Sequence, residues 1–244
     1  MLKKILVKKF GLGLVLSSLS LLCAQTQGAI ITSFDTGVDV EVSSTFSVNE
    51  FETEFFDSQV FVDGSASGGA SGSDDFGPVI LDSDEVGLVS AAADGQVNGM
   101  GGFVQSSWET DGYLFFENNT GSDISVNVLF AITWFAEIFT ASSDEEAYAT
   151  AGFFIEDSFG DMVFEDFIEL DSLIKGTGIF NDSDYFQVNF NFVLADGDFE
   201  EYYFIADSFG FAESPQAVPE PKGLFLAGLA LLFAFRQRKL NGIV

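Results

Sequence analysis

Three short stretches of the sequence bring several acidic side chains together, and carboxylate oxygens are the ligands that Ca²⁺ prefers. The three clusters are Asp82/Asp84/Glu85, Asp144/Glu145/Glu146 and Asp196/Asp198/Glu200/Glu201. None has the twelve-residue spacing of an EF-hand loop or a tandem nonapeptide repeat, so a solvated turn is the commoner origin of such a cluster. Asp196 and Asp198, in "ADGDFEE", are the best candidates for a metal site. The sequence therefore predicts no cofactor, with Ca²⁺ as the one alternative left open.

Sugar chemistry is the second kind that these residues could support. Glycoside hydrolysis requires two carboxyl groups at a set separation, but acids are so frequent here that no pair stands out. Aromatic side chains could stack on sugar rings if they shared an exposed face, although in a β-sandwich most aromatic residues belong to the core. The candidates are Trp108, Tyr113, Tyr148, Tyr202 and Tyr203.

Histidine and cysteine, two residue types that commonly act in catalysis and metal binding, are absent or nearly absent from the sequence. The chain has no histidine, which is the commonest general base and zinc ligand. Its single cysteine, Cys23, lies in the N-terminal leader described below. We therefore expect a protein without catalytic activity.

The charge distribution separates the two ends of the chain from its middle. Of 9 Lys and Arg residues, only Lys175 lies between Ile30 and Val218, whereas 37 of the 38 Asp and Glu residues lie there. This segment has a net charge of −36 and should repel nucleic acid and anionic surfaces. A nucleic-acid partner is thus excluded.

The elements that would position these side chains are strands. In "FQVNFNFVL" (186–194), and over the longer stretch 124–138, apolar residues alternate with polar or small ones, which is the period of a half-buried strand. The second stretch predicts one long bent strand or two strands joined at a bulge. Turns are predicted at 117–123, 156–161, 181–184 and 195–198 from their Gly, Asn and Asp content. The pattern predicts an all-β fold, an antiparallel β-sandwich or jelly roll.

Three regions follow from these patterns. Residues 1–29 have a lysine-rich start, an apolar stretch and small residues at Gly28 and Ala29, which is typical of a signal peptide. Residues 30–214 form the acidic β-sandwich domain, in which the Gly/Ser-rich segment 63–77 is predicted to be a flexible loop. Residues 215–244 form a tail with a short transmembrane helix at about 223–235, which at ~1.5 Å per residue is marginal for a bilayer core of about 30 Å.

The tail has three ordered features: "VPEP" at 218–221, the apolar run, and a basic end. Together with the leader, these resemble the PEP-CTERM sorting signal of Gram-negative bacteria. The resemblance covers about 25 residues, and it implies that Pro219, Glu220 and Pro221 are recognised by the membrane transpeptidase exosortase. It also makes the basic end part of the signal, through Arg236, Arg238 and Lys239. Lys222 directly after the motif and "LNGIV" after the basic cluster depart slightly from the pattern.

The resemblance implies a location and a set of partners. Export would use the Sec translocon, and the C-terminal helix would tether the chain transiently in the inner membrane until exosortase processes it, with the basic cluster on the cytoplasmic side. The body would then reach the cell surface or the extracellular matrix, where exopolysaccharide of a biofilm is a candidate partner. We therefore expect a cell-surface or matrix protein without catalytic activity. The alternative is a secreted carbohydrate-binding or carbohydrate-active module carried by the same tail.

Overall fold

The computed structural model describes residues 30–215, and about three quarters of them belong to β-strands. The strands are β1 (Thr32–Ser44), β2 (Val48–Asp63), β3 (Ala66–Gly72), β4 (Phe76–Leu81), β5 (Gly87–Val97), β6 (Gly102–Glu117), β7 (Ile124–Thr140), β8 (Glu146–Asp157), β9 (Met162–Asp171), β10 (Gly178–Leu194) and β11 (Phe199–Ser214). One short helix, α2 (Ser172–Lys175), joins β9 to β10. The prediction of an all-β fold is confirmed for this part of the chain.

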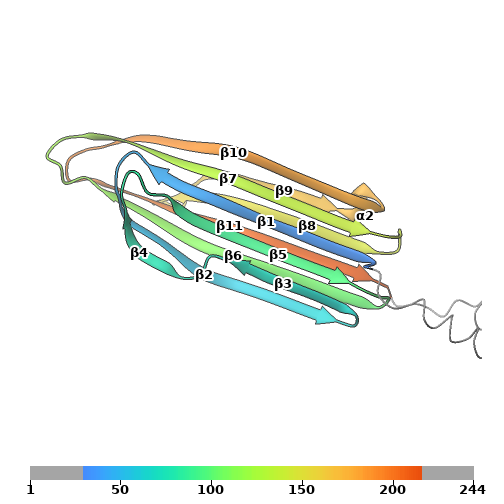
Figure 1. Cartoon of the computed structure of the whole chain (residues 1–244). Helices are drawn as coiled ribbons and strands as arrows, with labels where there is room; N and C mark the ends of the chain where they lie inside the picture. The colour runs from blue at the N-terminus through green and yellow to red at the C-terminus, as the bar shows by residue number, and fades with distance from the viewer. Residues whose placement is uncertain (1–29, 216–244) are drawn as a thin grey trace, which may run out of the picture.

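The strands form two antiparallel sheets that pack face to face, as Figure 1 shows. The first, sheet A, has the order β10-β7-β1-β5-β3, and the second, sheet B, has the order β4-β2-β6-β11-β8-β9. Every strand pair is antiparallel. Strands distant in sequence are neighbours in both sheets, so the surfaces of the molecule combine residues from the whole described chain.

The core lies between the sheets and is dominated by phenylalanine. Phe204 of β11 is 1% exposed, and its ring centroid lies 6.0 Å from those of Phe130 and Phe153 and 6.3 Å from that of Phe51. Phe130 comes from sheet A and the other three from sheet B, so these rings join the two layers. Their burial supplies the main stabilising free energy of a sandwich of this kind.

The longest alternating stretch of the sequence forms one strand. β7 is paired with β10 over its whole length, from Ile124↔Leu194 to Thr140↔Gly178, without a register shift. Val126, Phe130 and Ile138 on its inner face are fully buried. Of the two forms that the alternation allowed, the single long strand is therefore the one adopted.

The prediction of a flexible loop at 63–77 is wrong for most of that segment. Ala66–Gly72 is strand β3, which pairs with β5 in register, and Phe76 already belongs to β4. The small residues allow β3 to lie directly on β6: a Cβ atom at Gly68 would lie 2.6 Å from Val104 Cγ2, and one at Gly72 would overlap the indole of Trp108. The glycines thus permit close packing of two layers, rather than chain flexibility.

Replacing Gly72 by alanine should destabilise the protein by about 1–3 kcal/mol, the usual effect of overpacking a filled interior. The new methyl group would overlap Trp108 Nε1 and the carbonyl oxygen of Ser90. The matched control is Gly69→Ala on the same strand, where the added Cβ meets only the side chain of Asp94, at 3.0 Å. Urea denaturation of both variants would measure the difference. Equal stability of the two would contradict this explanation of the glycine-rich sequence.

A second correction concerns the turn predicted at 181–184. These residues lie inside β10, where Asp182 faces Ala136 and Asp184 faces Trp134 of β7. β10 is an edge strand, and the Asp182 and Asp184 side chains accept hydrogen bonds from the next residue's N–H, that of Ser183 at 3.0 Å and that of Tyr185 at 2.8 Å. Turn-forming residues are therefore accommodated in a strand whose outer edge needs no partner, where charges also discourage edge-to-edge aggregation.

Both ends of the described chain lie at one end of the sandwich, here called the proximal end (Figure 1). The N–H of Ile31 donates to Val97 O at 2.9 Å, and the N–H of Gly101 donates to Ser214 O at 3.0 Å, so the first and last strands meet the same β5–β6 turn. The opposite, distal end carries the turns after β1, β4, β6, β8 and β10. Within residues 30–215 no helix is long and apolar enough to cross a membrane. The helix predicted at 223–235 falls outside the described residues.

Candidate functional site

The outer face of sheet B gathers most of the chemistry-bearing side chains of the described chain. Along β6 and β11 the even-numbered residues, such as Leu114 and Phe204, are buried, so the odd-numbered residues point away from the core. β2, β6, β11 and β8 are adjacent in this sheet, as Figure 1 shows. Residues paired across these strands lie on the same face and therefore form rows across the sheet.

An aromatic row crosses four strands of this face near the proximal end. It consists of Phe61 of β2, Phe103 of β6, Phe209 and Phe211 of β11, and Tyr148 of β8. Successive ring centroids lie 5.8 Å (Phe61 to Phe103), 6.5 Å (Phe103 to Phe211) and 5.8 Å (Phe211 to Tyr148) apart, and Phe209 lies 6.0 Å from Tyr148. Phe61, at the open edge of the row, is 59% exposed. The row is thus a continuous apolar ridge that solvent can reach.

A second aromatic cluster lies toward the distal end of the same face. Tyr113 and Tyr203 are paired across β6 and β11, with ring centroids 5.1 Å apart. Phe115 and Phe199 follow at 5.9 Å. Tyr203 is 45% exposed and Phe199 is 59% exposed. At about 3.4 Å per residue, Tyr113 of this second cluster lies about 34 Å along β6 from Phe103 of the aromatic row.

A carboxylate band separates the two aromatic groups. Glu109 of β6 faces Asp57 of β2 on one side and Asp207 of β11 on the other, and Asp111 faces Glu54. Lys175, the only basic residue in 30–215, is exposed in α2, which lies at the proximal end and not within this band. The band therefore has no basic partner among the described residues.

Burial and mutual repulsion raise the pKa of several of these carboxyl groups. For Glu109, burial raises the pKa most, and the charges of Asp111, Asp207 and Asp57 raise it further. For Asp207, burial raises the pKa, and nearby backbone N–H groups of Asp207 and Gly152 offset part of the rise. Burial, followed by the charge of Glu54, raises the pKa of Asp111. The band holds negative charge that its surroundings stabilise poorly.

Two carboxylate oxygen atoms of the band show directly that its negative charge is poorly stabilised. Among the described residues, Asp111 Oδ1 and Asp207 Oδ1 are the buried side-chain atoms without a hydrogen-bond partner, and both belong to the band. Asp207 lies so close to Gly152 of β8 that a Cβ atom there would be 2.5 Å from Asp207 Oδ1. A buried oxygen without a partner is destabilising, and a cation bound near it would offset that effect.

The structure divides the five aromatic residues that the sequence nominated for sugar stacking. Tyr202 is 7% exposed and belongs to the core. Trp108 also points inward, donates from Nε1 to Thr110 Oγ1 at 2.8 Å, and packs 4.8 Å from Phe55. Tyr113, Tyr148 and Tyr203 share the outer face of sheet B. The expectation of core placement therefore holds for two of the five residues only.

Sequence reasoning missed the phenylalanines and carboxylates of this face. Phe103, Phe209 and Phe211 would have been assigned to the core by residue type, and acids are too frequent for Glu109 or Asp207 to stand out. One signal was available in "FEEYYFIADSFGF" (199–211), where aromatic residues occupy both parities of a single strand. A strand of that kind must expose aromatic side chains on one face.

In each of the three acidic clusters considered for Ca²⁺ binding, a carboxyl group accepts a hydrogen bond from a backbone N–H group of a turn. Asp196 Oδ1 accepts a hydrogen bond from the N–H of Gly121 at 2.8 Å, and Glu145 Oε2 accepts one from that of Ala141 at 2.7 Å. Glu85 Oε2 likewise accepts from the N–H of Asp82 at 3.0 Å. The backbone of Asp198 forms its bonds with Ala195 and Asn118. In the described part of the chain no three acidic side chains converge as metal ligands.

Asn118 joins the two distal turns that contain these groups. It is fully buried, and its side-chain Nδ2 donates to Ser122 O and Leu194 O, both at 2.8 Å. Its backbone N–H donates to Asp198 O and its carbonyl oxygen accepts from Gly197. Asp196 thus belongs to a hydrogen-bonded connection between the β6–β7 and β10–β11 turns. The sorting residues Pro219, Glu220, Pro221, Arg236, Arg238 and Lys239 lie outside the described residues.

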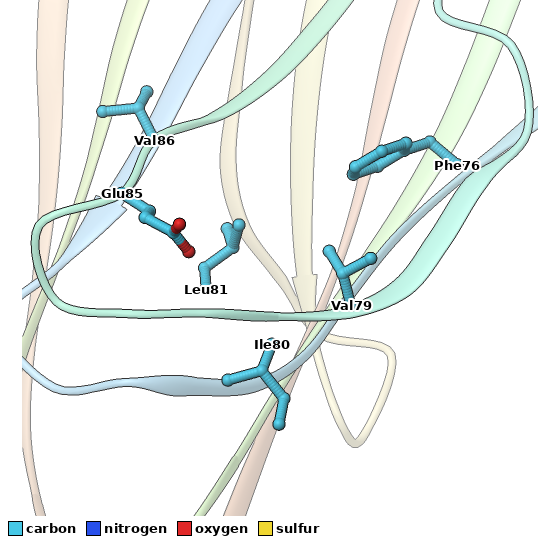
Figure 2. Close-up of a pocket in the computed structure, with 6 residues that line it drawn as sticks. All are labelled: Phe76, Val79, Ile80, Leu81, Glu85 and Val86. Carbon is cyan, nitrogen blue, oxygen red and sulfur yellow. The ribbon is translucent and has the colours of Figure 1, made fainter.

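An open apolar hollow of about 370 Å³ lies at the distal end, between β4 and the following turn. It is lined by Phe76, Val79, Ile80, Leu81, Glu85 and Val86, and Figure 2 shows Ile80 on the opposite side of its strand from Val79 and Leu81. Glu85 is its one carboxylate and is already bonded within the turn. The hollow thus lacks the two opposed carboxyl groups that glycoside hydrolysis requires.

Comparison with known proteins adds little to this geometry. No family model matches the chain, and no curated protein matches it. Solved structures that match include a provisionally assigned β-galactosidase of Bacteroides fragilis (10% identity, 70% of this chain and 34% of that one) and β-glucuronidase 2 of Bacteroides uniformis (7% identity, 70% and 22%). This chain spans about a third or less of those chains. Both TM-scores are 0.13, so neither superposition bears on fold or activity.

Proposed function

We propose that this protein is an exported, non-catalytic protein of the cell surface or extracellular matrix, sorted by exosortase through its PEP-CTERM-like tail. The ordered features of the two chain ends support the sorting step: a leader typical of a signal peptide, then "VPEP", an apolar run and a basic end. The absence of histidine and the single carboxylate of the distal hollow favour a body without catalytic activity.

The placement of the described ends is the structural observation that supports display. Thr32 and Ser214 both lie at the proximal end, next to the β5–β6 turn. A tail joined after Pro215 would therefore hold the body by this end alone. The distal end and the outer faces of both sheets would remain available to the surroundings of the cell.

Replacing Pro219, Glu220 and Pro221 together by alanine should abolish processing while leaving export intact. The full-length chain should then accumulate in the inner membrane of a Gram-negative host that carries an exosortase. Cell fractionation followed by immunoblotting would measure the distribution. A matched control is triple alanine replacement of Asn241, Gly242 and Ile243, beyond the basic cluster, which should be processed normally. If the variant with all three alanine replacements were found in processed form at the cell surface, sorting through this motif would be refuted.

The outer face of sheet B favours a second candidate function, that of a carbohydrate-binding module carried by the same tail. Tyr113, Tyr148 and Tyr203 share this face with the exposed ring of Phe61, and aromatic side chains arranged on an open face can pack against the apolar faces of sugar rings. The two functions are compatible, because a displayed matrix protein requires something to adhere to.

A further inference from the structure

The outer face of sheet B combines two features that select a ligand: exposed aromatic groups and negative charge without a basic partner. The aromatic row and the second cluster lie at the two ends of the face, and the carboxylate band lies between them. A ligand that covers the whole face must therefore offer apolar surface and positive charge alternately along its length.

We propose that the outer face of sheet B binds a linear polysaccharide of amine-bearing sugars, with ring faces packed on the aromatic groups and ammonium groups at the carboxylate band. This inference rests on the proposed carbohydrate-binding function and specifies its ligand by charge. Each residue of such a polymer has both a sugar ring and a protonated amine, so it matches both parts of the face in any register.

Charge complementarity excludes the other classes of glycan. An acidic polysaccharide would meet a body of net charge −36 and a band in which Glu109 already faces Asp57 and Asp207. A neutral polysaccharide would cover the band and remove its water without compensating its charge, which is unfavourable for partly buried carboxylates. The ammonium groups of a cationic polysaccharide would instead offset the uncompensated negative charge of Asp111 and Asp207, whose buried Oδ1 atoms lack hydrogen-bond partners. Ammonium groups are also attracted to the faces of the neighbouring rings.

A basic peptide would satisfy the charge but fits the shape less well. Extended peptides bind by adding to a sheet edge, and helical peptides bind in grooves. The aromatic row instead runs across the strands, and at Phe103, Phe209, Phe211 and Tyr148 the strands β6, β11 and β8 are paired on both sides, so that only β2 at Phe61 has an open edge. An open ridge of rings suits a flat, repeating ligand better than a peptide with varied side chains.

The test is a binding measurement on the full-length chain in a non-ionic detergent at about pH 6, a compromise between protonation of the glucosamine amines and ionisation of the band, whose carboxyl pKa values are raised. The probes are a β-1,4-linked glucosamine hexamer, its fully N-acetylated and hence neutral counterpart, and hexalysine as a charge-matched peptide. We expect the glucosamine hexamer to bind at least about tenfold more tightly than either of the other two by isothermal titration calorimetry at near-physiological salt, a difference of about 1.4 kcal/mol.

Two variants of this face should each remove part of the preference. The pair Glu109→Gln and Asp207→Asn should reduce the affinity for the glucosamine hexamer to that for the acetylated one. Phe61→Ala, at an exposed edge position, should weaken binding of both hexamers. The matched control combines Asp39→Asn and Leu88→Ala on the outer face of sheet A, where both residues are exposed, and should change neither affinity. Circular dichroism of each variant would verify that it is folded.

The remaining outcomes each contradict a different part of the proposal. Equal binding of the two hexamers would overturn the requirement for charge while leaving the carbohydrate-binding function in place. Hexalysine binding as tight as glucosamine binding, and unaffected by Phe61→Ala, would show a charged surface without sugar recognition. Absence of binding to either hexamer would overturn both the inference and the carbohydrate-binding function. None of these results would bear on sorting by the tail, which the localisation experiment tests separately.

Discussion

Replacing Phe204 by alanine should lower the free energy of unfolding by about 3–5 kcal/mol, which is the usual cost of removing a fully buried phenylalanine. The Phe204 ring contacts Phe51, Phe130 and Phe153, and it covers Gly112 of β6, where an added Cβ atom would overlap it. The substitution would therefore leave a cavity at the place where the two sheets are joined. Urea denaturation followed by fluorescence or circular dichroism would measure the loss.

Phe199→Ala is the matched control, because Phe199 lies on the same strand but is 59% exposed. Its replacement should change the stability by less than about 0.5 kcal/mol, as for most surface substitutions. If both variants lost the same stability, Phe204 would not be the centre of the core. Folding of Phe204→Ala with unchanged stability would contradict the observed packing of the two sheets.

The second large effect is an increase in thermal stability on acidification from neutral pH. The pKa values of Glu109, Asp111 and Asp207 are raised in the folded state above their ordinary values of 4.5, 3.8 and 3.8. The folded state therefore binds protons more readily than the unfolded chain does, and its stability falls as pH rises. This destabilisation is absent at pH values below the ordinary pKa values of the unfolded chain, and it is complete at pH values above the raised pKa values of the folded state. Most proteins behave in the opposite way, because their carboxylates are paired with cations.

Melting curves recorded at about pH 5 and at about pH 7, at matched ionic strength, would measure this effect. For a protein of this size, each kcal/mol gained in the free energy of unfolding should raise the melting temperature by about 2–4 °C. Asp207→Asn should raise the melting temperature at neutral pH and reduce its dependence on pH, because the amide keeps the shape of the side chain without its charge. Asp39→Asn is the control for removing one exposed charge and should have a smaller effect. A melting temperature that falls on acidification would show that the carboxylates are stabilised in the folded state.

Hydrophobic alternation predicted the strands correctly where one face of a strand is buried. The stretches 124–138 and 186–194 form parts of β7 and β10 as expected, because burial against the opposite sheet enforces a period of two residues. The turns at 117–123, 156–161 and 195–198 were also placed correctly, since each connects two antiparallel strands at the distal end. Local residue preferences and the tertiary structure agree in these segments.

Two segments were predicted wrongly because their local preferences are outweighed by their neighbours. The Gly and Ser residues of 66–72 would favour a loop, but pairing with β5 and packing on Val104 and Trp108 make them a strand. The acidic 181–184 segment would favour a turn, but it continues β10 because β7 pairs with it throughout. In both cases the strand that pairs with the segment is distant in sequence, so the residues around the segment do not reveal that it forms a strand.

The sequence by itself determined the all-β architecture, the acidity of the body and the exclusion of histidine chemistry, since these follow from composition and from the period of each strand. Which face an aromatic residue would occupy was decided only by the tertiary structure. Tyr113, Tyr148 and Tyr203 belong to β6, β8 and β11, and alternation assigns each only to one side of its own strand. Whether those sides coincide depends on strand order and register across the sheet, and the same register aligns Asp57, Glu109 and Asp207 into one band.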